Sequence, residues 1–127
     1  NKHWAMIVID LRKRCCEVRM YDSLGDYDNM WLGFKAKIKQ YIEGEYDRLP
    51  VAMKKIFSKK FDDVHKWQFS STLDLLKDGE CIPLQSNAID CGVFMCSYAD
   101  YISQGRELNF TQADVGMLRY RMLMSIL

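Results

Sequence analysis

The sequence predicts an α+β domain in which a central sheet is flanked by helices. Two adjacent segments near the N-terminus have the composition of strands, and several later segments repeat apolar residues at the three-and-four spacing of amphipathic helices. The chain has 127 residues, of which 49% are hydrophobic. A chain of this length can bury one hydrophobic core, so we expect one domain or part of one.

The first two elements are predicted to form a β-hairpin. Residues 4–10 are apolar and partly β-branched, which indicates a strand buried on both faces. Residues 15–21 alternate apolar and polar side chains, which is typical of a second strand, and residues 22–26 have the composition of a turn. His3 opens the hairpin and Asp22 closes it. Antiparallel pairing would therefore bring these two side chains to the same end of the sheet.

The middle of the chain is predicted to be helical. Residues 30–46 carry apolar side chains at helical spacing, and Pro50 follows them. Residues 51–66 are rich in lysine with apolar residues interleaved, which indicates a second amphipathic helix or an ordered insertion with a solvated basic face. Residues 67–76 fit no clear pattern, and residues 77–80 have turn composition.

The last third of the chain is predicted to contain a loop and two helices. Residues 81–90 have a short extended start and lead into a helix that runs from Gly92 to about Ser103. Gly105 follows that helix, as glycine commonly does at a helix C-terminus. Residues 111–114 match a capping box, so the final helix should begin directly after them.

Charge and cysteine content limit the class of protein. The 18 basic and 17 acidic residues give a net charge of +1, so no overall field favours nucleic acid or an anionic membrane as the main partner. The sequence has neither an apolar run that could span a membrane nor a signal-peptide pattern at its start. Five irregularly spaced cysteines match neither a disulfide framework nor a zinc site, and indicate reduced thiols. We expect a soluble intracellular monomer.

Four side chains could together carry out acyl chemistry. Cys91 is predicted at the first turn of a helix, where backbone N–H groups and the helix dipole favour a thiolate, and the small Gly92 lets another group approach closely. His3 is the candidate base, because His65, the other histidine, lies in the lysine-rich segment and is expected at the surface. The other four cysteines are expected to be small buried side chains.

An orienting carboxylate and an oxyanion donor complete the set. Asp22 could accept a hydrogen bond from His3, although it is equally suited to forming a turn. Asp10 is a poorer candidate, because seven residues of strand would place it about 20 Å from His3. Gln85 could stabilise an oxyanion together with the backbone amide of Cys91, although a loop glutamine alone is usually only solvated.

The order of these residues resembles that of the Ulp/sentrin-specific proteases, which process and remove the ubiquitin-like modifier SUMO. Joint occurrence in this order is specific, whereas each motif alone would be weak. The order His, Asp, Cys also differs from that of papain-like enzymes, where the cysteine comes first. The matching motifs are His3-Trp4, Tyr21-Asp22-Ser23-Leu24-Gly25, Pro83-Leu84-Gln85, Asp90-Cys91-Gly92-Val93-Phe94, Tyr98-Ala99-Asp100-Tyr101-Ile102 and Asn109-Phe110-Thr111-Gln112.

The resemblance implies a papain-like, Ulp-type cysteine protease core with a central mixed sheet. It implies that His3, Asp22 and Cys91 form a triad, that Gln85 is the oxyanion residue, and that Trp4 lines a narrow tunnel for the Gly-Gly end of SUMO. Without the resemblance, Trp4 could be a core or strand-end aromatic residue. The implied partners are SUMO or another ubiquitin-like protein and its conjugates, with no cofactor, in the nucleus or nucleocytoplasm.

The family's catalytic domain extends upstream of the histidine, where it carries much of the modifier-binding surface and a second tunnel tryptophan. Residues 1–127 are therefore expected to be the C-terminal portion of a single catalytic domain, with residues 46–66 resembling an insertion. Three alternatives stay open: a catalytically inactive module that binds a ubiquitin-like modifier, a protease for a different modifier, and an acyltransferase that uses the same residues.

Overall fold

A three-stranded mixed sheet lies at the centre of the protein. The computed structural model describes residues 2–12, 16–25, 30–61 and 66–127. The strands are β1 (Met6–Asp10), β2 (Glu17–Tyr21) and β3 (Gln68–Ser70), in the spatial order β1-β2-β3. Strand β1 pairs with β2 antiparallel, with Met6 opposite Tyr21, and β3 pairs with β2 parallel, with Gln68 opposite Glu17. The predicted hairpin and the predicted mixed sheet are both confirmed.

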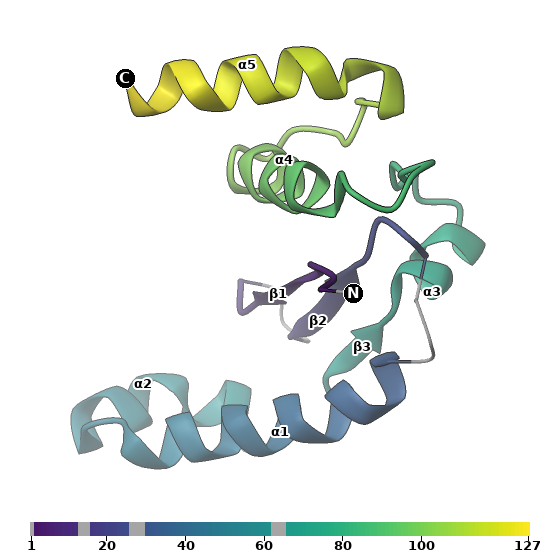
Figure 1. The fold of residues 1–127 in the computed structure, drawn as a ribbon. Coiled ribbons are helices and arrows are strands. Elements are labelled where there is room, and N and C mark those ends of the chain that lie inside the picture. The colour runs from purple at the N-terminus through teal and green to yellow at the C-terminus, as the bar shows by residue number, and fades with distance from the viewer. Residues whose placement is uncertain (1, 13–15, 26–29, 62–65) are drawn as a thin grey trace.

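Helices cover both faces of this sheet. On one side lie α1 (Met30–Arg48) and α2 (Val51–Phe61), and on the other lie α4 (Cys91–Ser103) and α5 (Val115–Ile126) (Figure 1). The short α3 (Thr72–Lys77) follows β3, and a 3-10 turn, η3 (Gln112–Asp114), precedes α5. The arrangement confirms the predicted α+β class.

Two hydrophobic cores meet at strand β2, because its side chains alternate between the two faces of the sheet. Val18 and Met20 point toward a core that they share with Trp31 and Ile38 of α1. Tyr21 belongs to the opposite core, which is formed mainly by α4 and α5. The members of that second core include Phe94, Tyr98, Tyr101, Phe110, Val115 and Leu118. The alternation expected for the second strand is thus confirmed.

Strand β1 is not buried on both faces, contrary to the sequence prediction. Ile7 and Ile9 are each 38% exposed, whereas Met6 and Val8 are partly buried and pack against the core below α4. The reason is the position of the strand at an edge of the sheet, where α1 covers its outer side chains only in part. An apolar run alone does not distinguish an edge strand from a central one.

The segment that the sequence left unassigned contains β3 and α3. Strand β3 has only three residues, too few for a recognisable alternation, and pairs with a strand about fifty residues away in the chain. Helix α3 begins with a capping box in which the Ser71 hydroxyl and the Asp74 carboxylate bond each other's backbone N–H groups. The helix predicted over residues 51–66 is described only to Phe61, and His65 lies outside the described residues.

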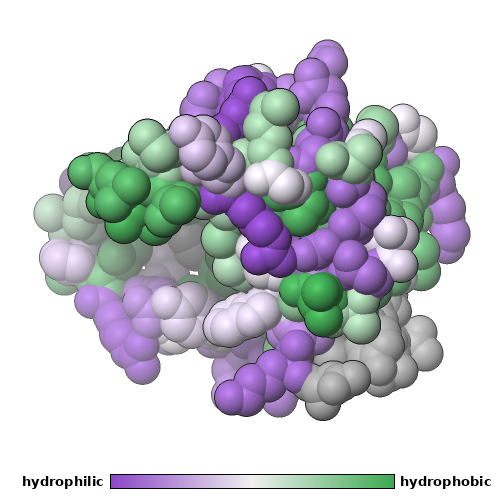
Figure 2. Space-filling model, turned by 45° about the horizontal axis from the view of Figure 1, so that its top comes forward, coloured by the Kyte–Doolittle hydropathy of each residue, from purple (hydrophilic) through white to green (hydrophobic). Residues whose placement is uncertain are grey.

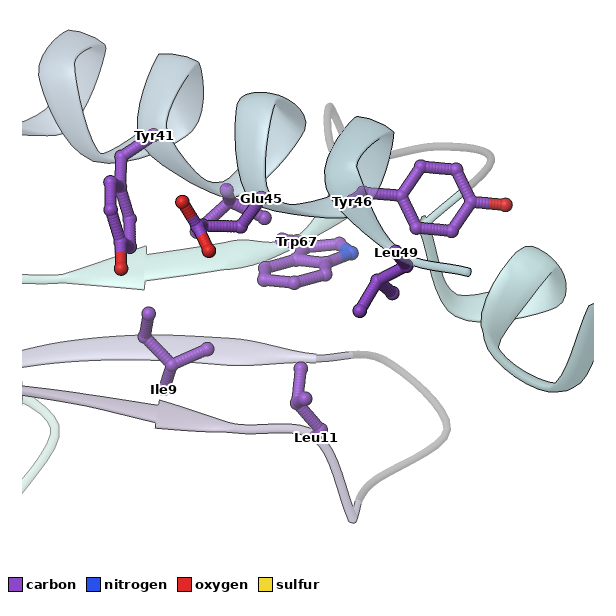
Figure 3. Close-up of a pocket in the computed structure, with 8 residues that line it drawn as sticks. Ile9, Leu11, Tyr41, Glu45, Tyr46, Leu49 and Trp67 are labelled. Atoms are coloured by element: carbon purple, nitrogen blue, oxygen red, sulfur yellow. The ribbon is translucent and has the colours of Figure 1, made fainter. Parts of the chain in front are cut away.

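A mostly apolar hollow of about 300 Å³ lies between α1 and the end of the hairpin (Figure 3). Tyr41 of α1 and Leu49, which follows that helix, face Ile9 and Leu11 across it, and Trp67 forms its inner wall. Leu11 comes directly after the C-terminal end of β1, whereas His3 lies before its N-terminal end. The hollow is therefore at the opposite end of the strand from the residues that the sequence singled out.

Hydrophobic side chains gather on the surface toward the C-terminal end of α5 (Figure 2). The large hydrophobic side chains exposed on that helix are Met117, Tyr120, Leu123, Met124 and Ile126. None of the helices in the described part of the chain is both long enough and apolar enough to cross a membrane.

Candidate active site

His3 and Asp22 meet at one end of the sheet. The Nε2 atom of His3 lies 2.7 Å from Oδ1 of Asp22, whose side chain is almost fully buried. His3 precedes β1 and Asp22 follows β2. Because the two strands are antiparallel, these residues lie at the same end of the sheet, as the sequence predicts. Asp22 also forms the expected turn: its Oδ1 accepts from the N–H of Leu24 at 2.8 Å, and its carbonyl accepts from that of Gly25.

Thr72 holds the backbone at this end of β2. Its hydroxyl oxygen accepts from the N–H of Asp22 at 2.7 Å and donates to the carbonyl of Met20 at 2.9 Å. The side chain is fully buried at the start of α3. The position of the Asp22 carboxylate therefore depends on a helix fifty residues further along the chain.

Cys91 is the first residue of α4 and is buried. The carbonyl of Asp90 starts the helix by accepting from the N–H groups of Val93 and Phe94. Trp4 lies against the next residue, since its Cδ1 atom is 4.0 Å from the position that a Cβ on Gly92 would occupy. His3 precedes Trp4 and Cys91 precedes Gly92, so this contact brings the histidine segment to the start of α4.

Gln85 is bound on both sides of its side-chain amide. Its Oε1 accepts from the Ser23 hydroxyl at 2.5 Å, and its Nε2 donates to the carbonyl of Asn87. Its backbone N–H donates to the carbonyl of Ser23 at 2.9 Å. Because a hydroxyl donor faces Oε1, the amide nitrogen is turned toward the loop that leads to Cys91. Gln85 is thus a buried, oriented side chain and not a solvated loop residue.

Tyr98 anchors the loop that carries Gln85. Its hydroxyl donates to the carbonyl of Pro83 from within the core. Burial raises the pKa of Tyr98, and the neighbouring Asp22 carboxylate and Tyr21 raise it further. Tyr98 is therefore a neutral hydrogen-bond donor at neutral pH.

Trp4 is exposed over 57% of its surface, so it is not a core side chain. It borders an open hollow of about 460 Å³ together with Gly92 and Met95 of α4 and Arg119 of α5. Asp10, at the other end of β1, forms an ion pair with Arg12 at 2.8 Å.

The remaining cysteines differ in burial. Cys16 is buried as expected, whereas Cys81 and Cys96 are exposed, which contradicts the prediction for those two. Cys96 lies on an outer position of α4, and Cys81 begins a loop, so neither faces a core. Cys15 lies outside the described residues. Within the ranges that the structure describes, no group of three or more His, Cys, Asp or Glu side chains could hold a metal ion.

Comparison with known proteins decides the family. The model of the Ulp1 protease family, C-terminal catalytic domain, matches residues 1–127. The chain belongs to this family. It is 34% identical over 127 residues to Sentrin-specific protease 2 of Homo sapiens and 32% identical over 125 residues to Sentrin-specific protease of Caenorhabditis elegans. It is 28% identical over 132 residues to Ubiquitin-like-specific protease 1A of Arabidopsis thaliana.

These alignments cover 98%, 98% and 100% of this chain, but only 18%, 15% and 21% of the respective relatives. The chain therefore spans about a fifth of the length of the curated relatives it matches.

Sequence reasoning about this member of the Ulp1 family missed several side chains around the site. Thr72 lay in the unassigned segment and gave no local signal. Ser23 and Gln112 are part of the family motifs, but nothing in their spacing indicates that they bind Gln85 and Asp90. Arg119 lies in the middle of a predicted amphipathic helix, where an arginine is normally a solvated surface residue.

Proposed function

We propose that this chain carries the catalytic residues of a cysteine protease that cleaves after the C-terminal Gly-Gly of SUMO, either to release conjugated proteins or to mature the precursor. The observation that carries the proposal is the hydrogen bond between His3 and the buried Asp22, next to the start of the helix that begins with Cys91. Membership of the Ulp1 family and the names of the sentrin-specific relatives support SUMO as the substrate class.

In this proposal His3 is the base that activates Cys91. Asp22 bonds Nε2 of His3, so Nδ1 is the ring nitrogen that takes the thiol proton. The helix N-terminus favours the thiolate that results. The sulfur attacks the carbonyl carbon of the terminal glycine, and the negative charge that develops on oxygen is stabilised by Nε2 of Gln85 and the backbone N–H of Cys91.

Collapse of this intermediate breaks the carbon–nitrogen bond. The imidazolium of His3 returns its proton to the departing amine, which leaves an acyl group on the sulfur of Cys91. His3 then removes a proton from water, and the resulting attack on the thioester releases the glycine carboxylate and the thiol. The reaction requires no cofactor.

Trp4 supplies specificity in the same proposal. The indole follows His3 directly and packs on Gly92, so a substrate that reaches Cys91 passes along its exposed face. Residues without side chains fit a narrow path next to a flat ring, and larger residues are excluded. This arrangement is consistent with a substrate that ends in two glycines.

The decisive experiment uses SUMO, ubiquitin and Nedd-type probes that carry a C-terminal electrophile, with the adduct located by mass spectrometry. We expect an adduct on Cys91 with the SUMO probe. The variant Cys91→Ser should form none. The matched control is Cys96→Ser, which removes an exposed thiol from the same helix and should label fully. An adduct on a different cysteine, or equal labelling of Cys91→Ser, would refute the assignment.

The same experiment separates the alternatives. Labelling by ubiquitin or the Nedd-type probe alone would identify a protease for another modifier. Stable binding of SUMO without any adduct in folded protein would identify an inactive binding module. Turnover that requires an acceptor amine would identify an acyltransferase.

We also propose that the protein acts as a monomer in the nucleus or nucleocytoplasm. In this proposal it binds neither nucleic acid nor a membrane. Its near-neutral charge supports the lack of an electrostatic partner of either kind. Sedimentation and imaging of the tagged full-length protein would test the oligomeric state and the location.

A further inference from the structure

Asp90 directly precedes Cys91 at the start of α4. Its carboxylate is held away from that helix. Aspartate at a helix N-cap usually accepts from the backbone N–H groups of the first turn. Asp90 occupies the N-cap of α4 but makes no such side-chain bond. Its Oδ1 instead accepts from Nη2 of Arg119 at 2.5 Å, and its Oδ2 accepts from Nε2 of Gln112 at 2.8 Å and from Nδ2 of Asn87 at 2.6 Å.

Two of these donors come from the C-terminal part of the chain. Gln112 belongs to η3 and Arg119 to α5, which follow Asp90 by 22 and 29 residues. The Asp90 side chain is only 8% exposed, so its charge needs these partners. Donation from Asn87, Arg119 and Gln112 holds the pKa of Asp90 below its usual range. The carboxylate is therefore ionised at neutral pH, directly beside the position of Cys91.

Gln112 also fixes the loop in front of the nucleophile. Its Oε1 accepts from the N–H of Ser86 at 2.8 Å while its Nε2 donates to Asp90. One amide thus joins both ends of the segment between Gln85 and Cys91. Asn87 closes the same segment from inside by accepting from the N–H groups of Ile89 and Asp90. Glutamate at position 112 could not reproduce this bridge, because a carboxylate has no N–H to donate to Asp90.

A carboxylate this close to the nucleophile has two possible harmful effects. Turned toward α4, it would accept from first-turn N–H groups and place its own negative charge at the helix end that favours the Cys91 thiolate. Without a balancing cation, it would raise the pKa of a neighbouring thiol. Among the described residues, the charged groups placed near the start of α4 are Asp90 and Arg119, which bond each other, and the His3–Asp22 pair, whose segment contacts Gly92 through Trp4. Tyr98 lies further along α4, beside Asp22.

We propose that Gln112 and Arg119 are positioning residues for the reaction at Cys91: they draw the Asp90 carboxylate toward α5 and balance its charge, which leaves the first turn of α4 free to stabilise the Cys91 thiolate. The inference rests on the proposed function, because it assigns Cys91 as the reactive thiol. It gives the final helix a part in catalysis through its bond to Asp90.

The test compares wild type, Arg119→Met, Gln112→Glu and the double variant Arg119→Met/Asp90→Asn. Arg121→Met is the matched control, since Arg121 is an exposed arginine two residues further along α5 whose side chain does not bond Asp90. The first readout is the rate of Cys91 alkylation by iodoacetamide between pH 5 and 10, mapped by mass spectrometry. The second readout is kcat and KM on SUMO with a C-terminal fluorogenic amide.

We expect Arg119→Met and Gln112→Glu to raise the midpoint of the alkylation profile by about one pH unit and to lower kcat on the order of tenfold, with KM nearly constant. Adding Asp90→Asn to Arg119→Met should return the midpoint toward wild type, because the unbalanced charge is removed. Arg121→Met should match wild type in both readouts. Arg119 is 54% exposed, so its replacement leaves the core intact even if Gln112→Glu does not fold.

A loss of kcat with an unchanged alkylation profile and no rescue by Asp90→Asn would overturn the inference, because a purely structural role predicts that pattern. Unchanged values in every variant would overturn it as well. Alkylation does not depend on the substrate. A protein that shows the shifted profile but never turns over SUMO would therefore refute the proposed function and leave this inference standing.

Discussion

Replacement of Thr72 by valine tests whether the Asp22 backbone is held from α3. Valine has nearly the shape of threonine but no hydroxyl, so the N–H of Asp22 and the carbonyl of Met20 each lose a buried partner. An orphaned buried group costs about 1–3 kcal/mol, and the added methyl returns about 1 kcal/mol. The two orphaned groups, less the contribution of the methyl, should therefore lower the free energy of unfolding by about 1–5 kcal/mol, with a middle value of about 3 kcal/mol.

Urea denaturation followed by tryptophan fluorescence measures this loss. With a loss of about 3 kcal/mol and a urea dependence of about 2 kcal/mol per molar, the midpoint should fall by about 1.5 M. The control is Thr72→Ser, which keeps the hydroxyl and loses only a methyl group, at a cost of about 1 kcal/mol. The valine variant should also lose activity, since Asp22 orients His3 in the proposed mechanism. A valine variant as stable as the serine variant would refute the reasoning.

Three further predictions concern α3 and α4. Hydrogen bonds from the Ser71 backbone N–H and hydroxyl lower the pKa of Asp74 in the folded protein. The ionised Asp74 therefore stabilises the fold fully above its unfolded-state pKa of about 3.9, and this stabilisation is lost as the pH falls through its folded-state pKa. Thermal melts of wild type and Asp74→Asn should therefore differ at pH 7 and converge toward pH 2. The buried hydroxyl of Ser97 has no hydrogen-bond partner among the described residues, so Ser97→Ala should raise the free energy of unfolding by about 1 kcal/mol in urea, and a loss of stability would contradict this. Gly92→Ala should fold normally, because its Cβ would meet Trp4 at an ordinary 4.0 Å. The variant should still lower kcat/KM if substrate passes along Trp4 next to Gly92, and unchanged turnover would exclude that path.

Much of the site follows from local features of the sequence. The alternation before Tyr21 and the turn after it predict a hairpin, and a hairpin necessarily brings His3 and Asp22 together. The helical spacing after Gly92 places Cys91 in a first turn. Such patterns are readable because strand and helix periods act over a few residues, where the order of side chains determines which face each one occupies.

Tertiary structure decided the features that depend on distant partners. Strand β1 has the composition of a buried strand, yet it lies at an edge because β3 pairs on the other side of β2. Thr72 reaches Asp22 across fifty residues, and no local pattern encodes that contact. Such pairings depend on how the helices pack against the sheet.

Asp90 shows most clearly how a tertiary contact can override a local sequence pattern. By local rules its side chain should cap α4, as aspartate does at many helix N-termini. Arg119 and Gln112 instead bind the carboxylate from a helix and a turn further along the chain. The sequence by itself determined which residues could perform the chemistry. Packing of α5 against α4 decided where the charge beside Cys91 points, because Arg119 offers the carboxylate an opposite full charge as well as a hydrogen bond, whereas a local cap offers only backbone N–H groups.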